Sequence, residues 1–201
     1  MALPAAVTEV TLDLGRVQRP LDACELFGAP VPIELELGLG KGLFLIEWAA
    51  SHPDSGFIGV ERCQRYLAMA ATRAARRGLA NLRLVRTTAE DMLFRCLADG
   101  SVAAVHIYFP DPWPKKRHLK RRLLTRGNLE RIARVLAPGG LLRVKTDHAG
   151  YAGAIAEALA GVPELVPVGA AAAFAGLPPT HYELKFALEG RAVHAFALRR
   201  R

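Results

Sequence analysis

Short apolar runs alternate with segments of helical periodicity along most of this 201-residue chain. Strands are expected at 33–37, 56–60, 82–85, 102–109 and 140–146, and helices at 42–52, 62–77, 89–98, 122–136 and 149–160. Strands that alternate with helices are typical of a parallel sheet covered on both faces. The pattern therefore predicts a doubly wound α/β fold, with a single domain over residues 33–201. Residues 1–32 form an N-terminal segment without a pattern that assigns it a structure.

The last part of the chain has a different pattern. Residues 181–188 and 191–200 alternate in polarity on either side of Glu189-Gly190, which predicts two strands in a hairpin. Residues 169–176, GAAAAFAG, predict a loop of simple composition. The sheet is therefore expected to be mostly parallel and to end in an antiparallel edge.

Composition and charge narrow the class of protein. With 51% apolar and 23% charged residues, the chain has the composition of a globular protein rather than a disordered one. Its formal net charge of +8 favours a polyanionic partner. The three cysteines are far apart and no Cys/His cluster has zinc spacing, so we expect a reducing compartment and no metal. No apolar run is long enough to cross a membrane, and we expect a cytoplasmic protein.

A glycine-rich turn follows the first of these strands. Gly38, Gly40 and Gly42 would let the backbone turn tightly and approach a ligand, or could serve only a strand-to-helix turn. Glu61, after the second strand, can accept both hydroxyls of a ribose, or could cap the next helix. Glu36 could face the cationic end of a cofactor, unless it points outward. Together these residues indicate a nucleoside cofactor, and the G-x-G-x-G spacing favours S-adenosylmethionine over NAD.

The fourth strand runs directly into a rigid corner and a basic arm. Pro110 and Pro112 fix φ on both sides of Asp111 and favour an extended backbone there, which preorganises the carboxylate at the ligand edge of the sheet. Trp113 could stack on a base or simply fill the loop. A charge run is usually only a solvated face, but this one adjoins the predicted site. We therefore expect phosphate binding by Lys115, Lys116, Arg117, His118, Lys120, Arg121 and Arg122.

Two more groups of polar residues follow. Asp147 comes directly after the strand at 140–146, and lies one strand away from Asp111 if the fourth and fifth strands are neighbours. Thr180, Tyr182 and Glu183 follow a rigid Pro-Pro. Glu183 could bind substrate or could be only a cross-strand partner.

Six segments, in this order, resemble the tRNA (guanine-N7-)-methyltransferase family: ELGLGKG, FIGVE, NLRLV, FPDPWPKKRHLKRR, KTDHAGYA and PPTHYE. The likeness extends over roughly residues 22–200. It implies the class I methyltransferase (Rossmann-like) fold with a seven-stranded sheet. It also implies S-adenosylmethionine as cofactor, tRNA as partner, and methyl transfer to N7 of a variable-loop guanosine, position 46 of the tRNA. No feature indicates an obligate protein partner, and a monomer and a homodimer both fit the sequence.

The resemblance also implies roles for individual residues. Asp111 would be the catalytic carboxylate. The cofactor ligands carried over from the family would be Glu36, Glu61 and Asp111, beside the glycine turn of Gly38, Gly40 and Gly42 and the position of Thr88. Of these, Thr88 stands where the family usually has an aspartate near the adenine. The guanine or tRNA site would comprise Lys115, Asp147, Thr180, His181, Tyr182 and Glu183, where His181 and Tyr182 replace a commoner Lys-Phe.

The chemistry of this reaction suits the residues. Guanine N7 carries a lone pair and no proton, so its methylation needs no general base. Catalysis is then mostly alignment, an effect worth up to roughly 7–11 kcal/mol. Carboxylates such as Asp111, Asp147 and Glu183 could hold the N1 and 2-amino donors of guanine and stabilise the cationic product.

Three other functions are weighed against this one. An amine methyltransferase acting on adenine would also use an acidic corner after the fourth strand, but usually with both prolines after the acid. A nicotinamide oxidoreductase is disfavoured by the glycine spacing. A non-catalytic tRNA-binding module would keep the basic arm but could lose Glu61 or the glycines.

Overall fold

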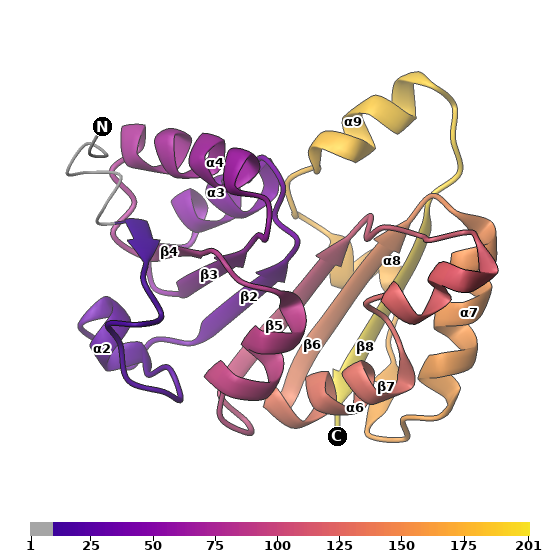
Figure 1. Ribbon diagram of the computed structural model, residues 1–201, viewed down its shortest axis with the longest axis horizontal. Helices are drawn as coiled ribbons and strands as arrows, with labels where there is room; N and C mark the ends of the chain where they lie inside the picture. Colours follow the sequence, from indigo (N-terminus) through magenta and orange to yellow (C-terminus); the bar gives the residue numbers. More distant parts are fainter. Residues whose placement is uncertain (1–9) are drawn as a thin grey trace.

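Eight strands form one sheet in the computed structural model, which describes residues 10–201 (Figure 1). They are β1 (Thr11–Leu12), β2 (Ile33–Leu37), β3 (Gly56–Val60), β4 (Leu82–Val85), β5 (Val102–Tyr108), β6 (Leu136–Thr146), β7 (Leu165–Pro167) and β8 (His194–Arg200). Their order in the sheet is β1-β4-β3-β2-β5-β6-β8-β7. The neighbours from β1 to β6 pair in parallel, whereas β8 is antiparallel to both β6 and β7. The predicted α/β class, mostly parallel with an antiparallel end, is confirmed.

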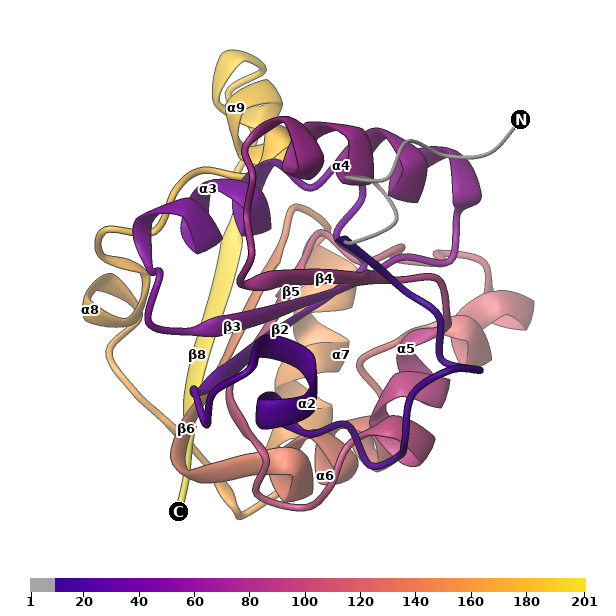
Figure 2. The same cartoon turned by 90° about the vertical axis from the view of Figure 1, so that its left-hand side faces the viewer.

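Helices cover both faces of this sheet (Figure 2). On one face lie α3 (Leu43–Ser51) and α4 (Gln64–Arg76), whose apolar side chains form one core cluster with β3 and β4. On the other face lie α2 (Ala23–Phe27), α5 (Ala89–Asp91), α6 (Arg126–Val135) and α7 (Ala149–Ala160), with a π-helical turn η1 (Met92–Cys96). The alternation of strand side chains between two apolar layers explains why the strands are apolar almost throughout.

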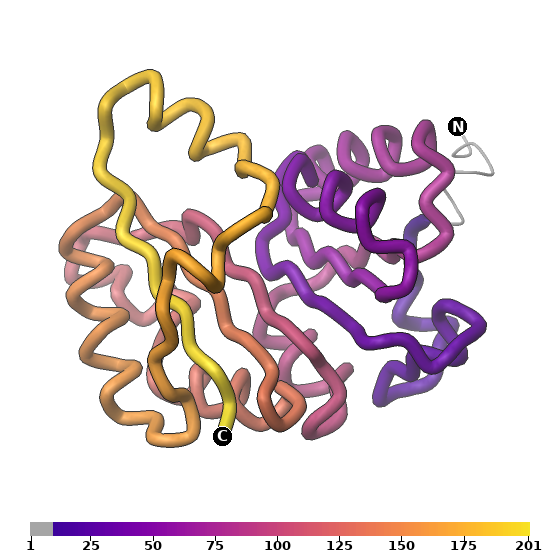
Figure 3. The backbone as a smooth tube through the Cα atoms, turned by 180° about the vertical axis from the view of Figure 1, so that it is seen from behind, coloured from indigo at the N-terminus to yellow at the C-terminus, as the bar shows by residue number. Residues whose placement is uncertain are grey.

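Three shorter helical elements complete the chain. The 3₁₀ helix η2 (Lys116–Arg121) follows β5, and α8 (Ala170–Phe174) and α9 (His181–Leu188) precede β8. Seen from behind, α9 and the chain on either side of it stand clear of the sheet at one end, while the C-terminus lies at the opposite end (Figure 3).

The strand order changes direction at β2, which has β3 on one side and β5 on the other. In sheets of this kind, ligands bind at such a switch point, outside the carboxyl ends of the strands. Glu36 of β2 is in register with His106 of β5, and Tyr108 of β5 with Lys145 of β6. The fold therefore brings the chain after β2, after β5 and after β6 to one edge.

The predicted helices and strands before residue 161 are present, with shifted ends. The predicted helix 122–136 begins only at Arg126, because Thr125 caps it by accepting a bond from the Asn128 amide at 3.4 Å. The predicted strand 140–146 begins earlier, at Leu136, and its pairing with β5 is irregular between Val102 and Ala104.

Two predictions for the tail were wrong. Residues 181–188 are the helix α9 rather than a strand, because Thr180 and Glu183 form a capping box. The Thr180 hydroxyl accepts from the Glu183 amide at 3.0 Å, and the Glu183 carboxylate accepts from the Thr180 amide at 2.9 Å. The antiparallel partners of β8 are instead β6 and β7. The loop predicted at 169–176 contains α8, whose four alanines favour a helix.

The sheet also has one strand more than the seven expected, counted over residues 10–201. The extra strand is β1, in which Thr11 pairs with Leu84 and Leu12 with Val85. Residues of the predicted N-terminal segment 1–32 therefore reach the sheet, and Leu21 and Leu26 are buried in its core. Residues 1–9 of that segment lie outside the described residues.

Candidate active site

A pocket of about 250 Å³ lies at the switch point, over the carboxyl ends of β2 and β5. The glycine turn, the start of α3, the first turn of α4 and α9 contribute its walls. Its lining residues are Glu36, Gly38, Leu39, Gly40, Lys41, Leu43, Phe44, Tyr66, Tyr108, Thr180, His181, Tyr182 and Lys185. Residues of β2, α3, α4, β5 and α9 thus share one cavity.

The glycine turn has a backbone that other residues rarely adopt. Gly38 and Gly40 have φ of 82° and 56°, and a Cβ on either would meet nothing within 4 Å. These glycines are therefore required by conformation, and the space beside them is open to a ligand. Gly42 differs, because a Cβ there would come within 2.9 Å of the Ala70 side chain. It does not line the pocket but lets α3 and α4 pack closely.

Glu61 ties the end of β3 to this turn. Its carboxylate is 8% exposed and accepts bonds from the amides of Gly40 at 2.9 Å and Cys63 at 2.8 Å. Cys63, not Glu61, is the N-cap residue of α4. A carboxylate has more acceptor positions than these two bonds use, so Glu61 retains capacity for hydroxyl donors of a ligand.

Glu36 is a buried carboxyl without a partner. It is 3% exposed, and its Oε2 makes no hydrogen bond to any described residue. Burial, with a further contribution from the nearby Glu61 charge, raises the pKa of Glu36 to about 8. A buried polar atom that is left unpaired is costly. Its position in the pocket wall marks it as a group that a ligand donor would satisfy.

The Pro-Asp-Pro corner lies directly after β5, at the same edge. Asp111 is exposed, does not line the pocket, and makes no hydrogen bond or ion pair among residues 10–201. Phe109 and Trp113 on either side have φ of 53° and 42°, a conformation that costs energy in residues with a Cβ. The Phe109 ring packs against Tyr182 and Phe186 of α9 at 5.7 and 5.2 Å between centroids. The corner and α9 are therefore one packed unit.

The basic arm folds back on Trp113. The Arg121 guanidinium lies 5.0 Å from the indole centroid, and the His118 ring 5.5 Å from it. Arg122 donates to the Pro112 carbonyl at 2.8 Å and lies 4.7 Å from the centroid of the Tyr151 ring. Trp113 thus has a structural role here. The exposed members of the arm without a partner among the described residues are Lys115, Lys116 and Lys120, while Arg117 contacts only His118.

Two predicted substrate carboxylates already have cationic partners. Asp147 follows β6, the neighbour of β5, and accepts from Arg191 at 2.6 Å. Glu183 forms an ion pair with Lys145 of β6 while its other oxygen caps α9. The alternative that Glu183 is only a cross-strand partner is wrong, since it lies in a helix. Of the two, Asp147 retains an oxygen with no partner among residues 10–201.

Thr88 lies apart from the pocket. Its hydroxyl caps α5, accepting from the Asp91 amide at 3.0 Å and donating to the Asp91 carboxylate at 3.1 Å. Sequence reasoning missed Tyr66, Tyr108 and Lys185 in the lining. Tyr108 ends a strand that is apolar except for His106, and its spacing of two from His106 places both side chains on one face of the sheet.

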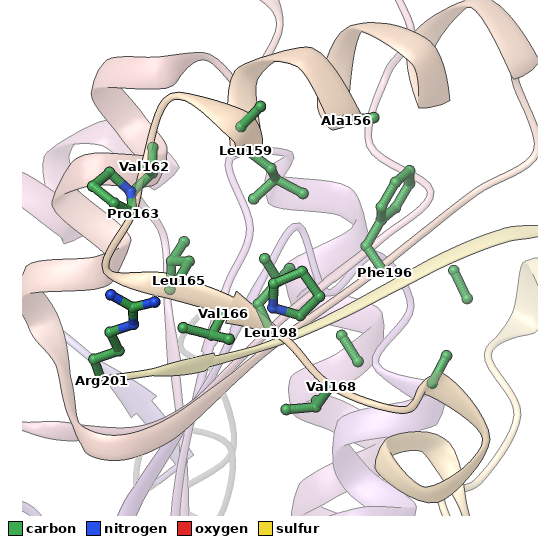
Figure 4. A pocket seen from close by; sticks show the side chains of 15 residues that line it. Ala156, Leu159, Val162, Pro163, Leu165, Val166, Val168, Phe196, Leu198 and Arg201 are labelled. Atoms are coloured by element: carbon green, nitrogen blue, oxygen red, sulfur yellow. The ribbon is translucent and has the colours of Figure 1, made fainter.

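A larger pocket of about 550 Å³ lies at the other end of the sheet, between α7, β7 and β8 (Figure 4). Its walls are apolar, including Leu159, Val162, Phe196 and Leu198, and Arg201 is the charged residue among them. It contains none of the predicted site residues. The smaller pocket is the candidate active site, because it holds the unpaired carboxyl and lies at the switch point.

Comparisons with known proteins agree with this architecture. A family model described as "Putative methyltransferase" matches residues 30–196. A tRNA (guanine-N(7)-)-methyltransferase from Mycolicibacterium paratuberculosis is 42% identical over 192 residues, 94% of this chain and 74% of the relative. One from Treponema pallidum is 38% identical over 182 residues, 90% of this chain and 70% of the relative. The chain belongs to the tRNA (guanine-N(7)-)-methyltransferase family.

Solved structures place this family member in the class I methyltransferase fold. The 16S rRNA methyltransferase KamB aligns with a TM-score of 0.63 and 21% identity, covering 92% of this chain and 96% of KamB. A geranyl diphosphate methyltransferase in complex with GPP and sinefungin aligns with a TM-score of 0.57 and 18% identity, covering 88% and 74%. At such identities the likeness concerns the fold alone.

The methyltransferase family uses S-adenosylmethionine, and the pocket suits this cofactor. The predicted cofactor is thus confirmed at the level of the family. The amino-acid end of S-adenosylmethionine carries an ammonium group, and the unpaired, buried Glu36 offers it a carboxylate. Open space beside Gly38 and Gly40 allows a ligand to approach the backbone. Within residues 10–201, no helix is long and apolar enough to span a membrane, and no group of three or more His, Cys, Asp or Glu side chains could hold a metal.

Proposed function

We propose that this protein transfers a methyl group from S-adenosylmethionine to N7 of a guanosine in tRNA. We further propose that the target is the variable-loop guanosine, position 46, and that the protein acts in the cytoplasm. One observation carries the proposal. The strand that ends at the pocket, β5, continues without interruption through the Asp111 corner into an exposed basic arm. A polyanion held by that arm would lie beside the cofactor pocket.

The proposed reaction requires no general base, because guanine N7 carries no proton. When bound, S-adenosylmethionine would supply an electrophilic methyl on a sulfonium, whose S–C bond would break as the N7–C bond forms, with S-adenosylhomocysteine as the leaving product. The chain must hold the base so that N7 and the methyl carbon lie in line, which is a proximity effect. It must also stabilise the positive charge that develops on the base.

Carboxylates near the pocket suit this task to different degrees. Asp111 has no partner among the described residues, and Asp147 has one oxygen free beside its bond to Arg191. Both could accept from the N1 and 2-amino groups of guanine. Glu183 has both oxygens engaged, by Lys145 and by the Thr180 amide. We therefore assign base binding to Asp111 and Asp147, and to Glu183 the docking of α9.

The test is methylation of unmodified tRNA with labelled S-adenosylmethionine, followed by mass analysis of the nucleosides. We expect 7-methylguanosine, mapped to the variable loop. A methylated adenine would support the amine-methyltransferase alternative. Binding without any methylation would support a non-catalytic module.

Asp111→Ala should lower the single-turnover rate at saturating tRNA and cofactor. Loss of a preorganised charge at the reacting centre costs on the order of 2–4 kcal/mol, or roughly 30- to 1000-fold. The fold should survive because the prolines stay. Asp54→Ala is the matched control, since Asp54 is also exposed and has no partner within residues 10–201, but precedes β3 at the far end of the sheet. A rate within threefold of wild type, with normal melting, would remove Asp111 from catalysis.

A further inference from the structure

A line of buried and partly buried polar side chains runs under the pocket, on the sheet face that α3 covers. Glu34 Oε2 accepts from Trp48 Nε1 at 3.0 Å and lies 2.7 Å from His106 Nε2. The other ring nitrogen of His106 lies 2.9 Å from the Tyr108 hydroxyl. His106 is 0% exposed and Tyr108 is 7% exposed. Buried groups of this kind are costly unless fully paired, and paired they hold one geometry.

The carboxylate of Glu34 fixes the direction of these hydrogen bonds. Burial alone would raise the pKa of Glu34, but its bond to His106 brings the pKa below the usual value, so Glu34 is an anion that only accepts. His106 Nε2 therefore carries a proton. Burial, the largest effect, lowers the pKa of His106. Glu34 raises this pKa and the charges of Arg143 and Lys145 lower it, and the net shift is downward. The ring is therefore neutral, and its Nδ1 accepts.

The tautomer of His106 determines what Tyr108 can do. Because Nδ1 accepts, the Tyr108 hydroxyl must donate to it, and burial, the main cause, raises the pKa of Tyr108 so that the phenol keeps its proton. The hydroxyl donates its one proton to His106, and the lone pairs of its oxygen remain free to accept. Tyr108 is thereby turned into an acceptor at the wall of the pocket.

Tyr108 lies next to the unpaired carboxyl. Both Tyr108 and Glu36 line the pocket, and Glu36 is in register with His106, two residues before Tyr108 on the same face of the sheet. An ammonium group has three donors, and a buried one needs an acceptor for each. Glu36 alone cannot surround it.

We propose that Tyr108, oriented by Glu34 and His106, binds the ammonium end of the methyl donor together with Glu36. In this scheme His106 and Glu34 are positioning residues that act through Tyr108. The inference rests on the proposed function only in taking S-adenosylmethionine as the methyl donor. It concerns binding of the methyl donor, which can be measured without tRNA.

The test compares two ligands by calorimetry without tRNA. S-adenosylhomocysteine carries the ammonium group, whereas 5′-methylthioadenosine has the same nucleoside but no amino-acid end. Tyr108→Phe should weaken S-adenosylhomocysteine about tenfold, because a hydrogen bond to a charged group is lost, and should leave 5′-methylthioadenosine within twofold. Tyr151→Phe is the matched control, since Tyr151 is fully buried and its hydroxyl is hydrogen-bonded, on the opposite face of the sheet. It should change neither affinity.

Two results would overturn the proposal: an unchanged affinity of Tyr108→Phe for S-adenosylhomocysteine, or an equal loss for both ligands, which would mean a general disturbance of the pocket. His106→Asn should reproduce the selective loss in weaker form, and a folded His106→Asn protein with wild-type affinity would remove the positioning role. If that variant does not fold, the Tyr108→Phe comparison still decides. Wild-type protein that binds S-adenosylhomocysteine but forms no 7-methylguanosine would refute the proposed function and leave this inference standing.

Discussion

Glu36 links the stability of the protein to the candidate active site. The pKa of its carboxyl is about 8 in the folded chain, where burial, aided by the Glu61 charge, raises it from the ordinary value of 4.5. Between those two pH values the folded state holds a proton that the unfolded state has lost. Stability from this group is therefore greatest at low pH and falls as pH rises from about 4.5 to about 8. A ligand cation beside this carboxyl would offset the cost.

Glu36→Gln should remove this pH dependence. Each unit of pKa shift corresponds to roughly 1.4 kcal/mol, so the variant should gain up to a few kcal/mol over wild type at pH 8 and almost nothing at pH 4.5. Urea denaturation at pH 4.5, 6, 7 and 8.5 measures the difference. Affinity for S-adenosylhomocysteine should fall in the same variant. Parallel stability profiles for wild type and Glu36→Gln would show that Glu36 titrates normally.

At the scale of single residues, the sequence predicted the position of the site better than the contacts between its side chains. Glu36, Gly38 and Gly40 were predicted from their places at the end of the first predicted strand and directly after it, and they line the pocket. Their roles toward the cofactor stay predictions. The pairing of Asp147 with Arg191 could not be foreseen, because it depends on how the chain after α9 folds over the end of β6.

At the scale of elements, α9 shows how a local cap overrides a strand-like pattern. Tyr182, Leu184 and Phe186 alternate with polar residues, which favours a strand. The Thr180–Glu183 capping box makes the segment helical instead, and only Phe186 is then buried. The helix leaves Leu184 and Leu188 at 49% and 91% exposure. The motif was present in the sequence, and weighing it would have corrected the prediction.

The structure also changes which cations of the arm a binding experiment should remove. Arg121 and Arg122 hold the arm to Trp113 and Tyr151, so their loss would disturb its fold. Replacement of Lys116, Arg117 and Lys120 by alanine should flatten the slope of log tRNA affinity against log salt by about 2 to 3, since each phosphate contact contributes roughly 0.7–0.9. Affinity for S-adenosylhomocysteine should barely change.

The measurement is a salt titration of tRNA binding for wild type and this triple variant. Alanine at Arg199 and Arg201 serves as a control, because these exposed cations lie at the opposite end of the sheet. The control should keep a slope close to that of wild type. Identical slopes for wild type and the arm variant would show that the arm is only a solvated surface.

At the scale of the whole molecule, the alternation of strands and helices predicted the layers of the fold. It could not predict the order of the last strands. The parallel pairing of the strands up to β6 is expected, because strand–helix–strand units form right-handed crossovers. The insertion of β8 between β6 and β7 has no local signal, because it depends on the six pairs that Leu141–Thr146 makes with His194–Arg199.

Strand β8 should therefore be a major contributor to global stability. Leu198 is 3% exposed within the main core cluster, and Leu198→Ala should cost about 2–5 kcal/mol. The same substitution at Leu188, 91% exposed on α9, should change stability by less than about 0.5 kcal/mol. Denaturation in urea compares the two variants. Similar midpoints would show that β8 is a dispensable edge of the sheet.

The position of β8 has a consequence for how the protein is made. During translation β6 emerges with one edge unpaired, because its neighbour on that edge is β8. Strand β7 then emerges with no partner at all, because it pairs only with β8 in this sheet. Both wait until residues 194–200 have left the ribosome, while the apolar side chains of β6 stay partly uncovered. A nascent chain with an open strand edge is prone to pair with other chains. Expression of this protein should therefore depend on prompt completion of synthesis, and chains interrupted before residue 194 should be captured by chaperones or aggregate.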